Sequence, residues 1–231
     1  MAFPIILSSP SGGGKTTIAH AILARRKDVG YSVSCTTRPP RDGEVDGRDY
    51  HFQSAKEFKR GQAAGEFAES AEVHGHLYGT LRSEVTRVLA SGKHVIMDID
   101  VQGAAQFSAA FPESVLIFIL PPSAEALLER LMARGTEDPK SFIRRLRSAK
   151  DELKAIDLYP YVVVNDRIAS AVATISRIST AEGVQRASDG VLKASNKERH
   201  DGIPRAIRTP SAREEIAGFI PHEGPPSHTH P

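Results

Sequence analysis

The segment Ser9-Pro10-Ser11-Gly12-Gly13-Gly14-Lys15-Thr16 follows a short apolar run near the start of the chain. Three successive glycines allow the backbone to curl until several N–H groups point at one anion. A helix beginning near Lys15 would add the positive end of its dipole. The pattern G-x-x-x-x-G-K-[ST] is met except at its first position, where Ser9 replaces glycine. The sequence therefore predicts a phosphate-binding loop in preference to a plain Gly/Ser turn.

This loop assigns several residues to a nucleoside triphosphate and its metal ion. Lys15 would place its ammonium group near the β- and γ-phosphates, and Thr16 would offer its hydroxyl to Mg²⁺. We expect ATP and Mg²⁺ as ligands. The predicted ATP-binding residues of the loop and the first helical turn are Ser9, Pro10, Ser11, Gly12, Gly13, Gly14, Lys15, Thr16 and Thr17.

The composition is typical of a soluble globular protein. Apolar residues make up 40% of the 231 residues, and 30 basic side chains nearly balance 28 acidic ones, so no strong field favours nucleic acid. The single cysteine, Cys35, excludes an internal disulfide and is typical of a reducing compartment. No apolar stretch approaches about 20 residues, and the N-terminus does not resemble a signal peptide. We therefore expect a cytoplasmic protein without nucleic-acid or membrane partners, its oligomeric state left open.

Apolar runs alternate with helical patterns along most of the chain. Buried parallel strands are predicted at residues 3–7, 95–99, 115–120 and 161–164. Helices are predicted at residues 15–26, 101–110, 124–133, 142–153 and 168–178. This alternation predicts an α/β fold with a parallel sheet flanked by helices.

Three regions depart from that alternation. Residues of about 32–92 are richer in aromatic and charged side chains and in glycine, which indicates a lobe inserted between core segments 1–31 and 93–182. The polar stretch at 135–140 and its flanks, about 134–147, predict a lid. From residue 183 to 231 the composition predicts a disordered tail. We interpret its last histidines as solvated rather than as a metal site; they are His222, His228 and His230.

Several residues of the inserted lobe could bind a nucleoside monophosphate. Arg38 and Arg41 are separated by two prolines that stiffen the backbone, so their guanidinium groups could clamp one phosphate, although a pair of solvated arginines is the alternative. Phenol groups of Tyr50 and Tyr78 could donate to the same phosphate or simply pack in a core. Candidate readers of a base edge are Glu69, which could accept two N–H donors, and the hydroxyls of Ser34 and Thr80.

Two carboxylates end the strand at residues 95–99. Asp98 and Asp100 would lie beside the phosphate loop, and one of them would orient Mg²⁺ through water. We expect the two to have different roles, and Asp100 could instead cap the following helix. Phosphoryl transfer needs positive charge, and some of the arginines around the predicted lid could supply it while the others stay solvated. The five arginines are Arg130, Arg134, Arg144, Arg145 and Arg147.

These residues together make the chain resemble the guanylate kinase family, whose members transfer a phosphoryl group from ATP to GMP. The resemblance extends over residues 3 to about 182 and rests on eight segments in family order: 9–16, 32–41, 43–50, 65–69, 78–80, 98–103, 134–137 and 163–166. It implies a P-loop NTPase-type parallel sheet with a GMP-binding lobe and a lid. The sequence departs from the family pattern at Ser9, Cys35, Ser70 and Arg167.

The resemblance also implies a role for each matching residue. It makes Lys15, Arg134 and Arg145 catalytic and places Asn165 at the adenine end of ATP. The GMP site would contain Ser34, Arg38, Arg41, Tyr50, Glu69, Tyr78, Thr80, Asp98 and Asp100. Thr16, and Asp98 through water, would hold the metal. Two alternatives remain: a related scaffold module that binds a protein partner without catalysis, and a small-molecule kinase acting on another substrate.

Overall fold

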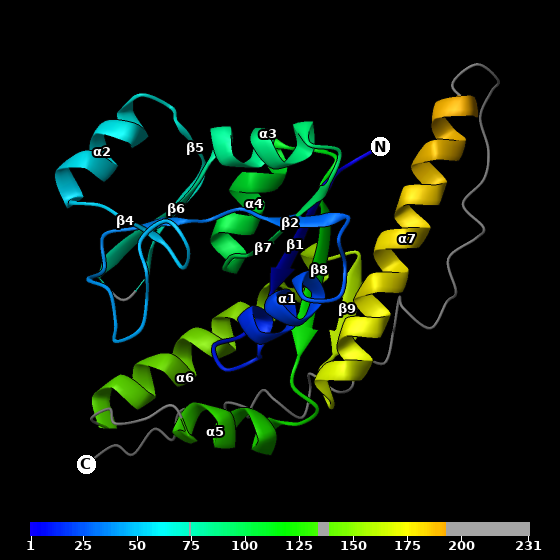
Figure 1. Ribbon diagram of the computed structural model, residues 1–231. Helices are drawn as coiled ribbons and strands as arrows, with labels where there is room; N and C mark the ends of the chain where they lie inside the picture. The colour runs from blue at the N-terminus through cyan, green and yellow to red at the C-terminus, as the bar shows by residue number, and fades with distance from the viewer. Residues whose placement is uncertain (74, 134–138, 193–231) are drawn as a thin grey trace, which may run out of the picture.

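The computed structural model describes residues 1–73, 75–133 and 139–192, and these residues form two sheets (Figure 1). The first sheet is entirely parallel, with the strand order β2 (Val29–Tyr31), β7 (His94–Asp98), β1 (Pro4–Ser8), β8 (Val115–Leu120), β9 (Tyr161–Val164). The second sheet has the order β4 (His51–Phe52), β3 (Cys35–Thr36), β6 (His76–Leu81), β5 (Phe67–Val73). The chain therefore has an α/β architecture around a parallel sheet, as the alternating pattern predicts.

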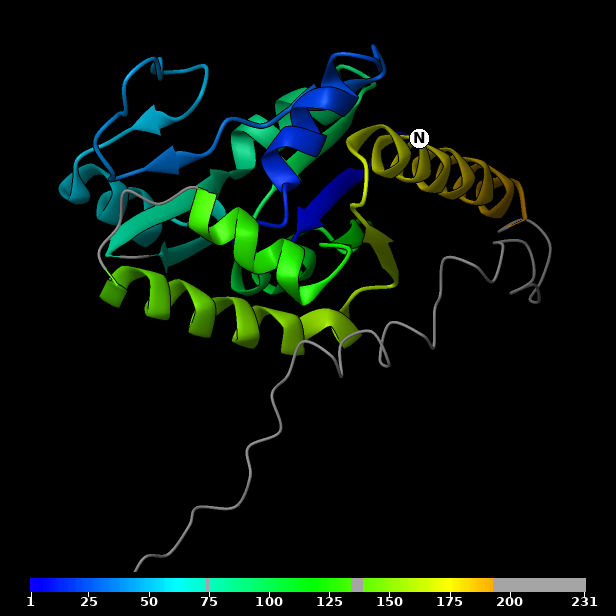
Figure 2. The ribbon, with the colours of Figure 1, turned by 90° about the horizontal axis from the view of Figure 1, so that it is seen from below.

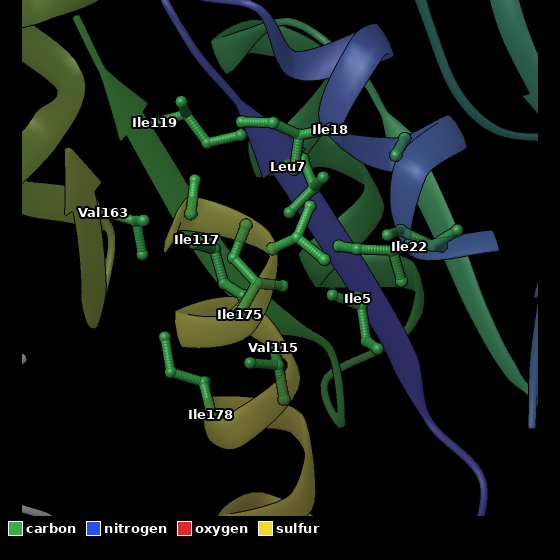
Figure 3. Close-up of a cluster of buried hydrophobic side chains, with 14 of the residues drawn as sticks. Ile5, Leu7, Ile18, Ile22, Val115, Ile117, Ile119, Val163, Ile175 and Ile178 are labelled. Atoms are coloured by element: carbon green, nitrogen blue, oxygen red, sulfur yellow. The ribbon is translucent and has the colours of Figure 1, made fainter. Parts of the chain in front are cut away.

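Helices cover both faces of the parallel sheet, which explains why its strands are apolar throughout. On one face lie α1 (Lys15–Leu23) and α7 (Ile168–Leu192), which pack against alternate residues of β1 and β8 such as Ile5, Leu7 and Ile117 (Figure 3). The other face is covered by α3 (Arg82–Ala90), α4 (Val101–Ala110), α6 (Pro139–Lys154) and the short 3₁₀ helix η1 (Ala155–Leu158).

Two further helices complete the described part of the chain. The helix α2 (Ala55–Ala63) begins with a capping box between Ser54 and Glu57 and packs on β5 through Phe58 and Phe67, whose rings stack. The helix α5 (Ala124–Ala133) lies beside α6 (Figure 2). Leu127 and Leu131 of α5 form a buried cluster with Ala149 of α6. No helix within the described ranges has the length and apolar content needed to cross a membrane.

The predicted disorder from residue 183 onward is wrong for its first ten residues, because α7 continues to Leu192. The extension is held against the sheet: Tyr161 donates its phenol hydrogen to Glu182, which also pairs with Arg186. The Arg186 guanidinium stacks 4.4 Å from the centre of the Phe3 ring. Residues 193–231, including the three terminal histidines, lie outside the described residues, so that part of the prediction is untested.

Candidate active site

The carboxyl ends of three strands meet at the phosphate loop. The loop follows β1 and leads into α1, with Gly12 and Gly14 at positive φ (86° and 91°). Gly13 is required for a different reason, because a Cβ there would stand 2.6 Å from Cβ of Ser9. The first N–H groups of α1 have no partner within the helix, so they are suited to bind an anion. The segment predicted from its glycines therefore has the geometry of a phosphate-binding loop.

Asp98, the last residue of β7, connects the loop to the sheet. The Thr16 hydroxyl donates a hydrogen bond to its Oδ2, and the Tyr31 phenol donates to its Oδ1 at 2.9 Å. Burial and the Asp98 charge both raise the pKa of Tyr31, so this phenol stays a donor. The hydroxyl of Thr16 and the carboxylate of Asp98 are hard oxygen ligands of the kind that Mg²⁺ prefers, so this pair fits the metal predicted here.

Asp100 has a different role from Asp98, because β7 ends at Asp98 and Asp100 lies beyond it, directly before α4. Its Oδ1 accepts hydrogen bonds from the backbone N–H groups of Gln102 (2.8 Å) and Gly103 (2.9 Å). Asp100 is therefore the N-cap of α4, which was the alternative to a ligand-binding role.

The residues predicted to hold a monophosphate gather around Arg38. This side chain is 8% exposed and lies 5.4 Å from the centre of the Tyr50 ring, and Tyr50 in turn packs edge-on against Tyr78. Its Nη2 donates to Glu44 at 2.8 Å, while the other Glu44 oxygen accepts from the backbone N–H of Arg41. Arg41 itself is exposed. Glu44, which no sequence motif indicates, therefore contacts both the guanidinium of Arg38 and the backbone of Arg41.

The predicted base reader, Glu69, is a buried carboxylate. It lies on β5, is 5% exposed and accepts a 2.7 Å hydrogen bond from Thr80 Oγ1 on β6. Burial, with a smaller contribution from the Asp100 charge, raises its pKa to about 7. Glu69 is therefore no ordinary solvated glutamate. Ser34, the third residue predicted to contact the base, is half-buried, and its backbone oxygen accepts from the backbone N–H of His51.

Asn165, directly after β9, contacts the other side of the phosphate loop. Its Nδ2 donates to the Gly13 oxygen at 3.0 Å, and its own backbone oxygen accepts from Arg130 Nη2. A Cβ on Gly14 would meet Asn165 Nδ2 at 2.7 Å. Two buried atoms here, Asn165 Oδ1 and Arg130 Nη1, have no hydrogen-bond partner within the described ranges. They are an acceptor and a donor that a nucleobase could satisfy.

The predicted lid arginines are described only in part. Arg134 lies outside the described residues, and Arg145 on α6 is 8% exposed and therefore buried rather than solvated. Arg147 is exposed, and Arg130 faces Asn165. Helix α6 also contributes Glu152, whose Oε2 accepts a hydrogen bond from the backbone N–H of Ser11 at 2.9 Å. Sequence reasoning missed this residue because nothing near it in the sequence indicates the phosphate loop.

The fold and these contacts define a P-loop nucleotide-binding α/β protein. Comparison with known families matches residues 1–182 to guanylate kinase. A guanylate kinase of Clostridium perfringens is 45% identical over 201 residues, which cover 86% of this chain and 93% of that protein. One from Symbiobacterium thermophilum is 48% identical over 186 residues, or 80% and 88% of the two chains. The chain belongs to the guanylate kinase family.

A solved structure supports the same conclusion about the fold. The crystal structure of guanylate kinase from Anaplasma phagocytophilum is 36% identical and superposes with a TM-score of 0.65. The likeness covers 78% of this chain and 86% of that one. It confirms a P-loop NTPase-type parallel sheet flanked by helices. The division of the chain into core, lobe at 32–92 and lid at 134–147 stays a prediction.

Proposed function

We propose that this protein transfers the γ-phosphoryl group of ATP to GMP and releases GDP and ADP. A phosphate oxygen of GMP attacks the γ-phosphorus in line; a new P–O bond forms as the bond to the β–γ bridging oxygen breaks, and ADP leaves. No protein nucleophile takes part. The reaction needs two phosphate sites, positive charge around the migrating group and exclusion of water.

The observation that carries the choice of GMP is the buried carboxylate of Glu69. An ionised carboxylate can accept hydrogen bonds from guanine N1 and N2 together, whereas adenine presents an acceptor at N1 and would offer the carboxylate no donor there. The Thr80 hydroxyl beside it, and that of Ser34, are the other proposed contacts to the base. The GMP phosphate would be bound by Arg38, Arg41, Tyr50 and Tyr78. Arg38 would either leave Glu44 or contact both Glu44 and the phosphate.

The phosphate loop would bind ATP. Residues 9–17 would enclose the phosphates, with Lys15 on the γ-phosphate. Asn165 Oδ1 and Arg130 Nη1, which have no hydrogen-bond partner within the described ranges, would form hydrogen bonds with the adenine. Thr16 directly, and Asp98 through water, would hold Mg²⁺, which neutralises phosphate charge when bound. Arg134 and Arg145 would stabilise charge on the transferred group. Asp100 accepts hydrogen bonds from the backbone N–H groups of Gln102 and Gly103, which supports a structural role at this site more than a direct contact with GMP.

A substrate panel tests this function directly. ADP formation would be measured with ATP and GMP, dGMP, AMP, UMP or CMP as acceptor. We expect rapid turnover with GMP and with dGMP, because the proposed contacts reach the base and phosphate and none reaches the 2′-hydroxyl. Turnover with another nucleotide in preference to GMP would favour the alternative small-molecule kinase. No turnover, with GMP still bound, would favour the scaffold module, against which the intact Lys15 and Thr16 argue.

We also propose that the protein acts in the cytoplasm, where ATP and GMP are available. A fluorescent fusion with an activity assay of the cell fractions would test this location. Recovery of the activity outside the cytoplasmic fraction would contradict it.

A further inference from the structure

Glu152 places a carboxylate against a loop whose backbone is suited to hold anions. Its Oε2 accepts from the Ser11 N–H at 2.9 Å, across 141 residues of sequence. The side chain is largely buried, and burial raises its pKa, while the Ser11 hydrogen bond and the Lys15 charge lower it. A buried acceptor of this kind is costly unless its hydrogen bond is made. The contact therefore fixes where α6 meets the phosphate loop.

The same helix carries Arg145. Seven residues, or two helical turns, separate Arg145 from Glu152, so both side chains leave α6 on the same side. Arg145 is buried. Ala149, which lies between Arg145 and Glu152, packs against α5, and Leu153, which follows Glu152, packs in the cluster that covers the sheet. A helix held along this face moves as a rigid unit, so the position of Glu152 determines the position of Arg145.

We propose that Glu152 is a positioning residue for phosphoryl transfer, which fastens α6 to Ser11 so that Arg145 stands at a set distance from phosphates bound in the loop. The inference rests on the function proposed above. Ser11 N–H is directed to Glu152, so this contact also orders the loop before ATP binds. Arg145 would stabilise the transition state, so a displaced Arg145 would slow the chemical step. The proposed GMP site lies on the second sheet, away from the contact between Glu152 and Ser11. Loss of Glu152 should therefore lower kcat and leave KM for GMP nearly unchanged.

The test compares Glu152→Ala with Glu152→Gln, which keeps an acceptor oxygen for Ser11. Asp151→Ala is the matched control, because Asp151 is the neighbouring residue on α6, is exposed and pairs with Lys154 of the same helix at 2.8 Å. We expect Glu152→Ala to lower kcat about tenfold to a hundredfold, in line with a small displacement of a catalytic group. KM for GMP should change less than about twofold, and Glu152→Gln should recover most of kcat.

A second measurement reports the contact itself. Hydrogen exchange of the Ser11 amide should accelerate in Glu152→Ala and stay slow in Glu152→Gln and in Asp151→Ala, with thermal midpoints recorded to confirm that each variant is folded. If folded Glu152→Ala keeps the wild-type kcat, or if Glu152→Gln is as impaired as Glu152→Ala, the inference is overturned while the proposed function stands. A wild-type chain that does not phosphorylate GMP overturns both.

Discussion

Glu69 and Gly103 meet where α4 packs on β5: a Cβ on Gly103 would stand 2.6 Å from Glu69 Oε2. Glu69 lies on β5 of the second sheet, and Gly103 lies in the first turn of α4, capped by Asp100 at the end of the parallel sheet. The absent side chain at Gly103 is what allows the helix to approach the carboxylate. The position of Glu69, the proposed guanine reader, therefore depends on Gly103 of α4, a helix that covers the parallel sheet.

The variant Gly103→Ala should displace Glu69 and weaken GMP binding. Alanine favours a helix by about 1 kcal/mol over glycine, and the carboxylate is the flexible end of its side chain, so the fold should tolerate the change. We expect KM for GMP to rise about tenfold or more, as for a lost hydrogen bond to a charged group, with KM for ATP unchanged. Steady-state kinetics would measure this. Ala105→Ser, at an exposed position of α4, is the control; unchanged GMP kinetics in Gly103→Ala would contradict the contact's role.

The variant Glu69→Gln should be more stable than wild type at neutral pH but poorer with GMP. The Glu69 pKa is about 7 in the folded protein against 4.5 as the ordinary value. Between these values the folded state keeps a proton that the unfolded state releases, so this group lowers stability as pH rises from 4.5 to 7. We expect the advantage of Glu69→Gln to be near zero at pH 4.5 and about 1–3 kcal/mol above pH 7. Denaturant unfolding at several pH values measures it, and an advantage independent of pH would argue against this assignment.

The affinity for GMP should fall as pH drops below about 7, the Glu69 pKa, because guanine N–H groups require the ionised carboxylate. Binding should then weaken up to about tenfold per pH unit and level off above the pKa. Isothermal titration of GMP across this range measures the effect. Glu69→Gln serves as the matched control and should bind weakly at every pH, its curve losing the step that belongs to Glu69. A step of the same size in both proteins would assign it to another group, such as the phosphate.

The variant Lys15→Ala should abolish phosphoryl transfer and leave the fold intact. Lys15 begins α1 at the phosphate loop, and its ammonium is predicted to contact the transferred phosphate. We expect a loss of kcat/KM of about a thousandfold, comparable to removal of a catalytic charge, with the thermal midpoint within a few degrees of wild type. Lys27→Ala, at an exposed position, controls for loss of a positive charge. Activity of Lys15→Ala within tenfold of wild type would refute the role.

Truncations should show that the ordered domain extends beyond residue 183. A chain ending at Leu192 keeps the Arg186 contact with Phe3 and the Glu182 pair, and should match wild type in stability and activity. A chain ending at Gly183 loses Arg186 and exposes part of the Phe3 ring, so its unfolding free energy should fall by about 1–2 kcal/mol. Thermal unfolding of both chains measures this. Equal stability of the two would mean that the last turns of α7 contribute nothing.

The local sequence determined the parallel core and the phosphate loop. Apolar runs such as residues 115–120 predict buried strands, and the glycines before Lys15 predict an anion-binding turn, because both follow from backbone sterics and from burial that neighbouring residues specify. The predicted helices at 101–110 and 124–133 agree with α4 and α5 residue for residue. Glu69, Thr80 and Asp98 were found by their chemistry together with a family resemblance, not by periodicity.

Only the tertiary structure decided which side chains meet. Tyr31 reaches Asp98 across 67 residues, and Glu152 reaches Ser11 across 141, so no local pattern could reveal either pair. The same holds for the end of α7, whose polar composition indicates disorder until the packing of Arg186 on Phe3 is included. A strand or turn is specified by residues adjacent in sequence, whereas a side-chain contact depends on how finished elements pack, and that packing brings distant residues together.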